Sequence, residues 1–441
     1  MATEILFQAF KWDGTHNGRA GDWYEHVMSK VDDMVRACFT HVWLPPPSKA
    51  RWQASMGYLP LDYYDLGEYR QWIQVWDDAA KQLKWIQHDA PSSLGPSYTG
   101  TETYFGHKTE LLSLIQALHD KDIVSIADVV INHRDPQQVN AEDEWCCWGS
   151  ADHQIESGKA VWGYKGRDDN PEEVSYRAGG AGIDDGEDGF GVNVAHTNAK
   201  ARADIKDWLA WLKNTIGFGG WRYDYVKGFA PGHIGEYNYH TGNPFSVGEF
   251  WDTNAQLVYD WIDGTDAYDV AKRSMAFDFC MQEHLRKVFW GAKPFRELAL
   301  WQHWWASIAG GWPEKAVTFL DNHDTARKAY NDFPTDAKRL IQGHVFLLTH
   351  PGVPCVFWSH MYDRGARVHD AIVRLGQLRS TMGIGRTTPV WVLRSNDICY
   401  AAKVGDRTLV KIGDEFWNPT GIAGTWKLEL WGDGYAIWVA S

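Results

Sequence analysis

The stretch LLSLIQALHDKDIVSIADVV, residues 111–130, decides the fold. Apolar side chains recur in its first half every three or four positions, at Leu111, Leu114, Ile115 and Leu118. This spacing predicts a helix that buries one face. The second half, 123–130, is apolar almost throughout, which is typical of a parallel strand covered by a helix. The two halves predict one helix–strand unit of an α/β fold.

Seven other short apolar runs repeat the strand pattern, with helical patterns between them. The full set of expected strands is 5–10, 41–44, 123–130, 220–225, 245–250, 275–279, 316–320 and 353–358. One of the helical stripes ends at Gly217, and glycine commonly terminates helices. Eight strands with intervening helices predict a closed (β/α)8 barrel, or TIM barrel.

Two insertions and a tail depart from the barrel pattern. Residues 134–196 have no helical stripe and are too long for an ordinary loop, so we expect an excursion domain after the third strand. A second insertion, 68–103, carries Trp72, Trp76 and Trp85 and is expected to hold an amphipathic helix. Strands that alternate between turns predict a C-terminal antiparallel β domain at 385–441, which leaves 1–133 and 197–384 for the barrel.

The charge balance excludes some classes of partner. The chain has 43 Lys and Arg against 57 Asp and Glu, a net charge of −14, and no basic run. Because phosphate binding needs a surplus of positive charge, we expect no nucleic-acid partner. No run of about 18 apolar residues is present to span a membrane. The N-terminus lacks a signal-peptide pattern, so the expected location is the cytoplasm, or secreted if such a peptide has been removed. The cysteine spacing predicts neither a disulfide framework nor a zinc site.

The chain has an unusual number of tryptophans, 26 in all. A tryptophan offers a flat apolar face and one N–H donor, so an excess beyond the needs of the core indicates flat, hydroxyl-rich ligands such as sugars. Simple core packing is the alternative. We expect packing for Trp43, Trp208 and Trp221, and sugar contacts for Trp12, Trp251 and the three tryptophans of the second insertion.

Ionisable residues cluster where the expected strands end, which is where barrel enzymes carry their chemistry. Three carboxylates are in this position, Asp224, Glu249 and Asp324, and two histidines and an arginine accompany them. Like charges gathered at one end of a barrel repel each other, so such a cluster indicates a functional site. Enzymes that hydrolyse the acetal bonds of sugars use a pair of carboxyl groups, one ionised and one protonated. The carboxylates and the tryptophans therefore point to the same substrate class.

Four segments at these strand ends resemble the four signature regions of the α-amylase family of glycoside hydrolases. They are 128–133, 220–228, 248–251 and 319–324, and they occur in the family's order. Further segments, 7–12, 41–46 and 315–319, look like plant and archaeal α-amylases. Residues 356–363 look like bacterial maltotetraose-forming amylases. The resemblance covers nearly the whole chain.

The resemblance implies a role for each matching residue. Asp224 matches the nucleophile, Glu249 the general acid/base and Asp324 the third carboxylate. The implied substrate-binding residues are Tyr58, His133, Arg222, Lys227, Trp251 and His323. Arg222 shares a strand face with Asp224 and can keep it ionised, whereas apolar neighbours can keep Glu249 protonated. A nucleophile at Asp224 implies retention of anomeric configuration, with the two carboxyls ~5 to 5.5 Å apart.

The family also holds a Ca²⁺ between the excursion domain and the barrel. Asn132 and the Gly228 carbonyl match two of its ligands, and the turn at Asp184 and Asp185 offers hard oxygen donors. At Asn193 the chain departs from relatives that have an aspartate, which lowers the charge of the ligand set. The alternative is that these are ordinary turn residues.

The implied function is retaining hydrolysis of internal α-1,4-glucosidic bonds in starch, glycogen and maltooligosaccharides, by a monomer. Two enzymes using the same residues remain as alternatives: an exo-acting, maltooligosaccharide-forming amylase and an α-glucan transglycosylase. A non-catalytic binding relative is a third class, but such a protein is expected to have lost carboxylates that are all present here.

Overall fold

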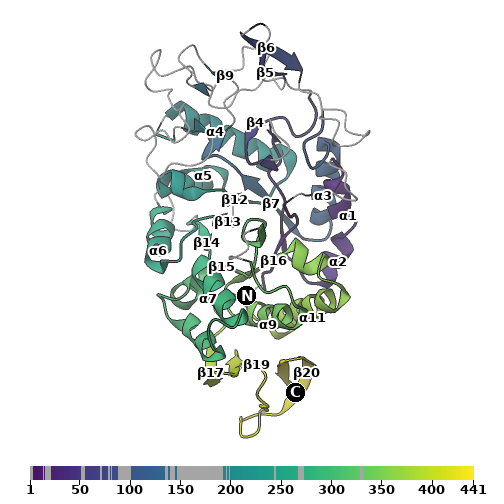
Figure 1. Cartoon of the computed structure of the whole chain (residues 1–441), viewed down its shortest axis with the longest axis vertical. Coiled ribbons are helices and arrows are strands. Elements are labelled where there is room, and N and C mark those ends of the chain that lie inside the picture. The colour runs from purple at the N-terminus through teal and green to yellow at the C-terminus, as the bar shows by residue number, and fades with distance from the viewer. Residues whose placement is uncertain are drawn as a thin grey trace.

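The computed structural model describes residues 3–12, 14, 21–50, 55–69, 72–77, 80, 82–87, 101–134, 138–139, 145–146, 192–194, 196–197, 199–242, 245–266, 273–327 and 332–441. Along its long axis the chain has a central barrel, with a β-hairpin at one end and a C-terminal sheet at the other (Figure 1).

Eight parallel strands close the barrel, and their order around it follows the chain. They are β1 (Leu6–Gln8), β2 (His41–Trp43), β7 (Val124–Val129), β12 (Gly220–Tyr223), β13 (Phe245–Gly248), β14 (Met275–Phe277), β15 (Ala316–Phe319) and β16 (Val353–Phe357). Each lies within one of the eight expected runs. The predicted (β/α)8 barrel is confirmed, and each strand is one to three residues shorter than the apolar run that predicted it.

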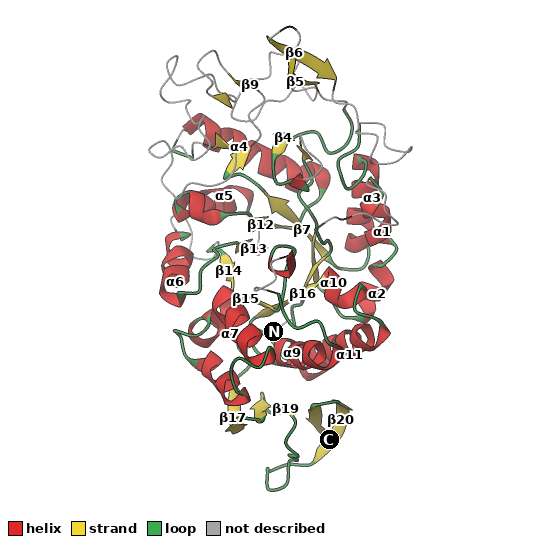
Figure 2. Cartoon of the chain, in the orientation of Figure 1, coloured by secondary structure: helices red, strands yellow, loops and turns green. Residues whose placement is uncertain are grey.

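Helices surround the strands (Figure 2). They are α1 (Trp23–Met28), α2 (Val31–Arg36), α3 (Lys108–His119), α4 (Ala199–Trp211), α5 (Pro231–Thr241), α6 (Ala255–Gly264), α7 (Phe279–Phe289), α8 (Ile308–Gly311), α9 (Ala337–Thr349), α10 (Trp358–Tyr362) and α11 (Ala366–Met382). The four apolar residues of the α3 stripe are buried, as their spacing predicts. In the described part of the chain, no helix is both long and apolar enough to cross a membrane.

Short helices of other types lie at several loops, namely η4 (Leu212–Ile216), η5 (Val226–Gly228), η7 (Phe295–Gln302), η8 (Pro313–Lys315) and η9 (Thr325–Arg327). The π-helical turn η4 continues α4 and ends at Gly217, whose φ of 102° is left-handed. Glycine adopts this conformation without steric cost, so the sequence signal for this helix end is confirmed.

The C-terminal domain is a five-stranded antiparallel sheet in the order β17-β18-β19-β21-β20. Its strands are β17 (Val390–Asn396), β18 (Cys399–Val404), β19 (Thr408–Gly413), β20 (Trp426–Gly432) and β21 (Tyr435–Ala440). A buried hydrogen bond of 2.8 Å between Tyr400 and Nε2 of His350 joins the sheet to the end of α9. Trp301 of η7 is also buried against this junction. The expected antiparallel domain is confirmed.

The second insertion is a β-hairpin rather than a helix. Strands β5 (Trp72–Asp77) and β6 (Gln82–Gln87) pair antiparallel, with Trp76 opposite Leu83. The expected amphipathic helix is therefore wrong. Trp72 and Trp76 are four positions apart, as in a helix stripe, but Trp85 lies nine positions further on and would fall on the opposite face of a helix. The hairpin lies at the end of the molecule farthest from the C-terminal sheet (Figure 1).

Pairs of short strands lie in the loop after β2 and at the start and end of the excursion segment. The pairs are β3 (Lys49–Ala50) with β4 (Pro60–Asp62), β8 (His133–Arg134) with β11 (Val192–Asn193), and β9 (Gln138–Val139) with β10 (Trp145–Cys146). Most of 134–196 lies outside the described residues, and so the expected excursion domain is described only at its two ends.

Candidate active site

The register between β7 and β12 sets the centre of the site. Arg222 of β12 lies directly opposite Asp128 of β7. Its Nη1 donates to Oδ1 of Asp128 at 2.8 Å and to Oδ1 of Asp224 at 2.7 Å. Its Nη2 lies 2.8 Å from Oε1 of Glu249, an ion-pair distance outside hydrogen-bonding geometry. One guanidinium therefore holds carboxylates from the ends of three adjacent strands.

Backbone hydrogen bonds fix the chain on both sides of this cluster. The N–H of Asp224 donates to the Val129 carbonyl at 3.0 Å, and the N–H of Glu249 donates to the Tyr223 carbonyl at 2.9 Å. Both carboxylates thus stand one position beyond the last residue of a barrel strand. Their side chains are almost completely buried.

Burial sets the protonation state of Glu249. Desolvation raises its pKa well above the ordinary value of a glutamate, and the charges of Asp224 and Asp324 raise it further. Arg222 and a backbone N–H lower the pKa, but the first effect is larger. Glu249 is therefore held protonated at a pH where an exposed glutamate is ionised. This is the behaviour expected from the apolar residues beside it.

Asp128 belongs to the same network, although no role was predicted for it. Burial raises its pKa to about 7, with Arg222 opposing the rise. Its Oδ2 accepts hydrogen bonds from Nε1 of Trp43 at 3.0 Å and from the Tyr58 hydroxyl at 2.8 Å. Trp43 was expected only to pack, and that expectation was incomplete. Its position at the end of β2 was the available signal, because strand ends at this face carry the site.

Three nearly parallel rings lie over the cluster. The rings of Tyr58 and His323 stack at 5.1 Å between centroids, and Trp12 lies 5.9 Å from each. Gln8 of β1 donates to Nδ1 of His323 at 2.9 Å, which places the proton of a neutral imidazole on Nε2. Burial lowers the pKa of His323 to about 4, so this ring is neutral. Nε2 of His323 is buried without a hydrogen-bond partner and lies 3.4 Å from Asp324.

Unlike His323, His133 has a hydrogen-bond partner on each ring nitrogen. Its Nε2 donates to the Tyr58 carbonyl at 2.8 Å, and its Nδ1 accepts from Asn132 at 3.2 Å. Burial lowers the pKa of His133. Both ring nitrogens are thus engaged within the protein, and the ring supports the loop that carries Tyr58.

A buried hydrogen-bond network shapes the loop that carries Asp324. Oδ1 of Asn322 accepts from the N–H of Asp324 at 2.9 Å and from the N–H of Thr325 at 2.8 Å. Asp321 accepts from the Thr325 hydroxyl at 3.0 Å and from Nε2 of His360 at 3.0 Å. His360 follows β16, so the network links the loops after two neighbouring strands. The third carboxylate itself is 31% exposed and faces the mouth.

Two expected substrate-binding residues lie beside the cluster rather than in it. Nζ of Lys227 donates to Asp252 at 2.8 Å and lies 5.0 Å from the centre of the Phe250 ring. Trp251 stacks on Phe279 at 4.8 Å and is partly buried. Both belong to the loops that follow β12 and β13.

The expected calcium ligands are described in part. Oδ1 of Asn132 is buried and has no hydrogen-bond partner among the described residues. Gly228 presses against it, since a Cβ at 228 would lie 1.6 Å from that oxygen. Asn193 is placed by its backbone, opposite His133 in the β8–β11 pair. Asp184 and Asp185 lie outside the described residues. Within the described part, no group of three or more His, Cys, Asp or Glu could hold a metal.

Comparisons with known proteins identify relatives of this chain. Residues 381–439 match the family described as the alpha-amylase C-terminal beta-sheet domain. The chain is 32% identical to a probable alpha-amylase 2 of Arabidopsis thaliana, over 99% of this chain and 94% of that protein. It is 26% identical to a glucan 1,4-alpha-maltotetraohydrolase of Roseateles saccharophilus, over 86% of this chain and 62% of that protein.

A solved structure shares the fold. An alpha-amylase from Geobacillus thermoleovorans, complexed with acarbose, superposes with a TM-score of 0.67 at 16% identity. The match covers 100% of this chain and 98% of the other. At this identity the likeness bears on the fold alone, and it agrees with the barrel and the C-terminal sheet described above.

Proposed function

Because this chain belongs to the α-amylase family of glycoside hydrolases, we propose that its site hydrolyses internal α-1,4-glucosidic bonds of starch, glycogen and maltooligosaccharides with retention of configuration. One observation carries the proposal. A single buried guanidinium, that of Arg222, contacts two carboxylates that need opposite protonation states, Asp224 and Glu249. A retaining glycosidase needs such a pair.

The first step forms a glycosyl-enzyme. Protonated Glu249 gives its proton to the glycosidic oxygen, and that oxygen leaves with the electrons of its bond to C1. Oδ2 or Oδ1 of ionised Asp224 attacks C1 from the opposite face and forms the new C–O bond. Arg222 supports this role, because its Nη1 at 2.7 Å stabilises the ionised form of Asp224.

The second step releases the sugar. Glu249, now ionised, takes a proton from water, and the water oxygen attacks C1 and displaces the carboxylate of Asp224. Two inversions give net retention. Asp324 and the free Nε2–H of His323 are placed to hold hydroxyls of the reacting sugar, and Tyr58 offers its ring as a platform. His133 keeps that platform in place.

Lys227 and Trp251 are proposed to bind sugars beyond the cleaved bond. Both lie in loops after adjacent barrel strands, and Lys227 is already neutralised by Asp252. The ammonium of Lys227 carries N–H donors, a type of group that binds sugar hydroxyls. The partly buried Trp251 offers an apolar face.

The described oxygens near η5 fit a Ca²⁺. Oδ1 of Asn132 is a buried, unpartnered hard donor, and Gly228 leaves no side chain beside it. Together with Asn193, Asp184 and Asp185 they would hold the ion, which would supply positive charge that ties the excursion segment to the barrel. Chelation is then expected to lower the melting temperature, and an unchanged melting curve would argue against the site.

Starch digestion tests the proposal. Proton NMR of the first-formed reducing ends is expected to show the α-anomer, whereas a β-anomer would exclude the covalent mechanism. Product lengths separate the alternatives. A spread of linear oligosaccharides supports an endo-acting hydrolase, one dominant length supports an exo-acting enzyme such as the maltotetraohydrolase relative, and new linkages or longer chains support transglycosylation.

A further inference from the structure

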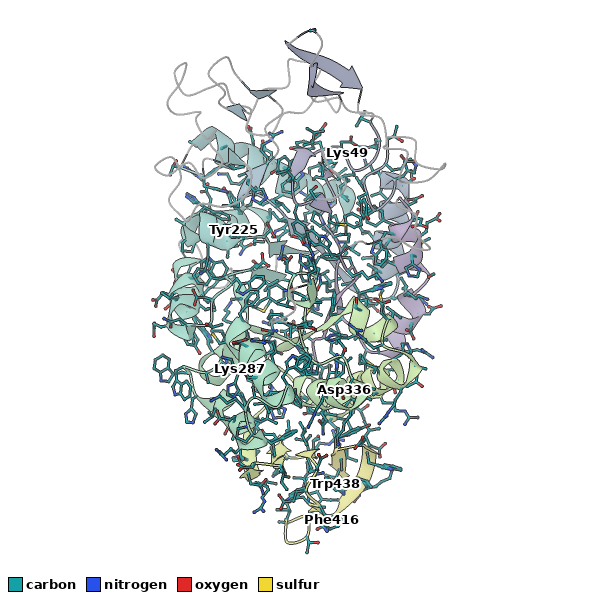
Figure 3. The ribbon with its side chains drawn as sticks, in the orientation of Figure 1. Lys49, Tyr225, Lys287, Asp336, Phe416 and Trp438 are labelled. Atoms are coloured by element: carbon teal, nitrogen blue, oxygen red, sulfur yellow. The ribbon has the colours of Figure 1, made fainter. Side chains whose placement is uncertain are left out.

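Tyr225, the residue after Asp224, has an unusual backbone. Its φ of 42° and ψ of 54° lie in the left-handed region. Among the described residues, the other non-glycine residues at positive φ are Cys38, Met56 and Asp122. A bulky aromatic residue is unfavourable in this conformation, which glycine and asparagine tolerate best. Tyr225 is labelled in Figure 3.

The turn redirects one backbone donor. The carbonyl of Tyr223 faces β13, where it accepts from the N–H of Glu249. In a continuing parallel ladder, the N–H of Tyr225, two residues further on, would face the same neighbour and meet a backbone carbonyl. Here it donates instead to Oε2 of Glu249, at 3.1 Å. The carboxyl thus has a fixed neutral donor on one oxygen and Arg222 near the other.

We propose that the left-handed turn at Tyr225 is a positioning device for Glu249, in which the backbone N–H rather than the aromatic side chain fixes the orientation of the carboxyl. The inference rests on the proposed function, in which Glu249 is the general acid. A side chain that resists positive φ turns the N–H away and leaves the carboxyl free to rotate. A general acid must point its proton at the leaving oxygen, so its free rotation slows proton transfer.

The charged groups around Glu249 give this device a measurable signature. Arg222 and the Tyr225 N–H favour the ionised carboxylate, and burial, Asp224 and Asp324 favour the neutral acid. Asp128 acts on Glu249 through the shared Arg222. Removing the N–H bond therefore raises the pKa of Glu249. Because the acid must be protonated to act, the alkaline limb of the pH–rate profile moves to higher pH.

The test is a series at position 225 in the full chain: Tyr225→Gly, Tyr225→Asn, Tyr225→Ala and Tyr225→Val. All four variants lose the phenol, so they differ mainly in their tolerance of positive φ. We expect Gly and Asn to share one alkaline limb. We expect Val to have a kcat about tenfold lower, with little change in KM, and an alkaline limb about half a pH unit higher, with Ala between.

Asp122 provides the matched control, because it also has positive φ, 56°, but lies in the turn before β7. Asp122→Val is expected to lower the melting temperature without moving the pH profile. Melting curves establish that each variant is folded; if Tyr225→Val does not fold, Ala against Gly and Asn carries the comparison. One common profile for all folded variants would overturn the inference. A parent chain that does not hydrolyse starch would instead overturn the proposed function.

Discussion

The hydroxyl of Tyr58 donates a 2.8 Å hydrogen bond to Oδ2 of Asp128. This bond connects the stacked rings to the buried charges beneath them, since Asp128 also pairs with Arg222. The position of the Tyr58 ring thus depends on Asp128. A change in the charge of Asp128 is expected to affect both the ring and Arg222.

Asp128→Asn is expected to change how stability depends on pH. The pKa of Asp128 is about 7 in the folded chain, raised by burial above 3.8 in the unfolded chain. The folded state therefore binds the proton more tightly, and ionisation lowers the stability of the parent as pH rises from about 4 to 7. The asparagine variant lacks this loss. Denaturant unfolding at several pH values should show the variant gaining relative to the parent across that range, and parallel curves would contradict the assignment.

Trp43→Phe is expected to lower activity while keeping most of the packing. The substitution removes one donor from Asp128 at a cost of about 1 kcal/mol. We expect kcat to fall about fivefold, with the Asp128-dependent pH effect altered. Trp221→Phe is the control, because its indole donates to Thr241 on the outer side of the barrel. Equal kinetic effects of both variants would show that Trp43 acts only by packing.

Glu249→Gln is expected to reduce turnover of starch by a factor of about 10³ or more, because an amide cannot donate the required proton. In the parent, activity should persist above the pH at which an exposed glutamate ionises, and fall as pH rises through the raised pKa of Glu249. Glu429→Gln, at an exposed position of β20, is the control for loss of a glutamate charge. A pH profile whose alkaline limb lies in the ordinary carboxyl range would contradict the role.

Arg222→Lys is expected to lose at least about a hundredfold in kcat, since one ammonium cannot contact all three carboxylates. Carboxylates left unpaired in a buried site also destabilise the chain, by about 3 to 5 kcal/mol. Arg379→Lys separates the two effects. Arg379 is equally buried but donates to the backbone carbonyls of Leu348, His350 and Gly352. That variant should melt earlier and keep its kcat; a similar loss of kcat in both would assign the Arg222 effect to stability.

Gly228→Ala is expected to destabilise the loop at η5, because the added Cβ would overlap Oδ1 of Asn132. If calcium binds there, the variant should also respond less than the parent to chelation in thermal melting. Gly385→Ala is the control, as a Cβ at that position meets nothing within 4 Å. A variant that melts with the parent and keeps the full response to chelation would exclude this loop from the metal site.

The barrel could be predicted because its strands are buried on both faces and read as continuous apolar runs. The second insertion could not, since Trp72 and Trp76 are four positions apart, a spacing that fits a helix stripe and one face of a strand alike. Pairing with the run that contains Trp85 decides for a hairpin, and that pairing depends on the turn between them. The apolar pattern of a single segment does not show which other segment it pairs with.

The site could be predicted where chemistry sits at the end of a strand, as for Asp224 and Glu249. The partners of Gln8, Trp43 and Asp128 could not be predicted, because these contacts join strands that are distant in the sequence. The left-handed conformation of Tyr225 was also hidden, since an aromatic residue gives no signal for positive φ. Such conformations persist only where the surrounding structure enforces them.

The shared guanidinium has a consequence for folding kinetics. The charge of Arg222 is compensated by carboxylates at the ends of β7, β12 and β13, so all three carboxylates reach it only after these strands have paired in register. Completing the catalytic centre and closing this side of the barrel are then the same event. During refolding, starch-cleaving activity should return together with barrel closure and without a further lag. The recovery of activity would therefore measure the rate at which the barrel closes.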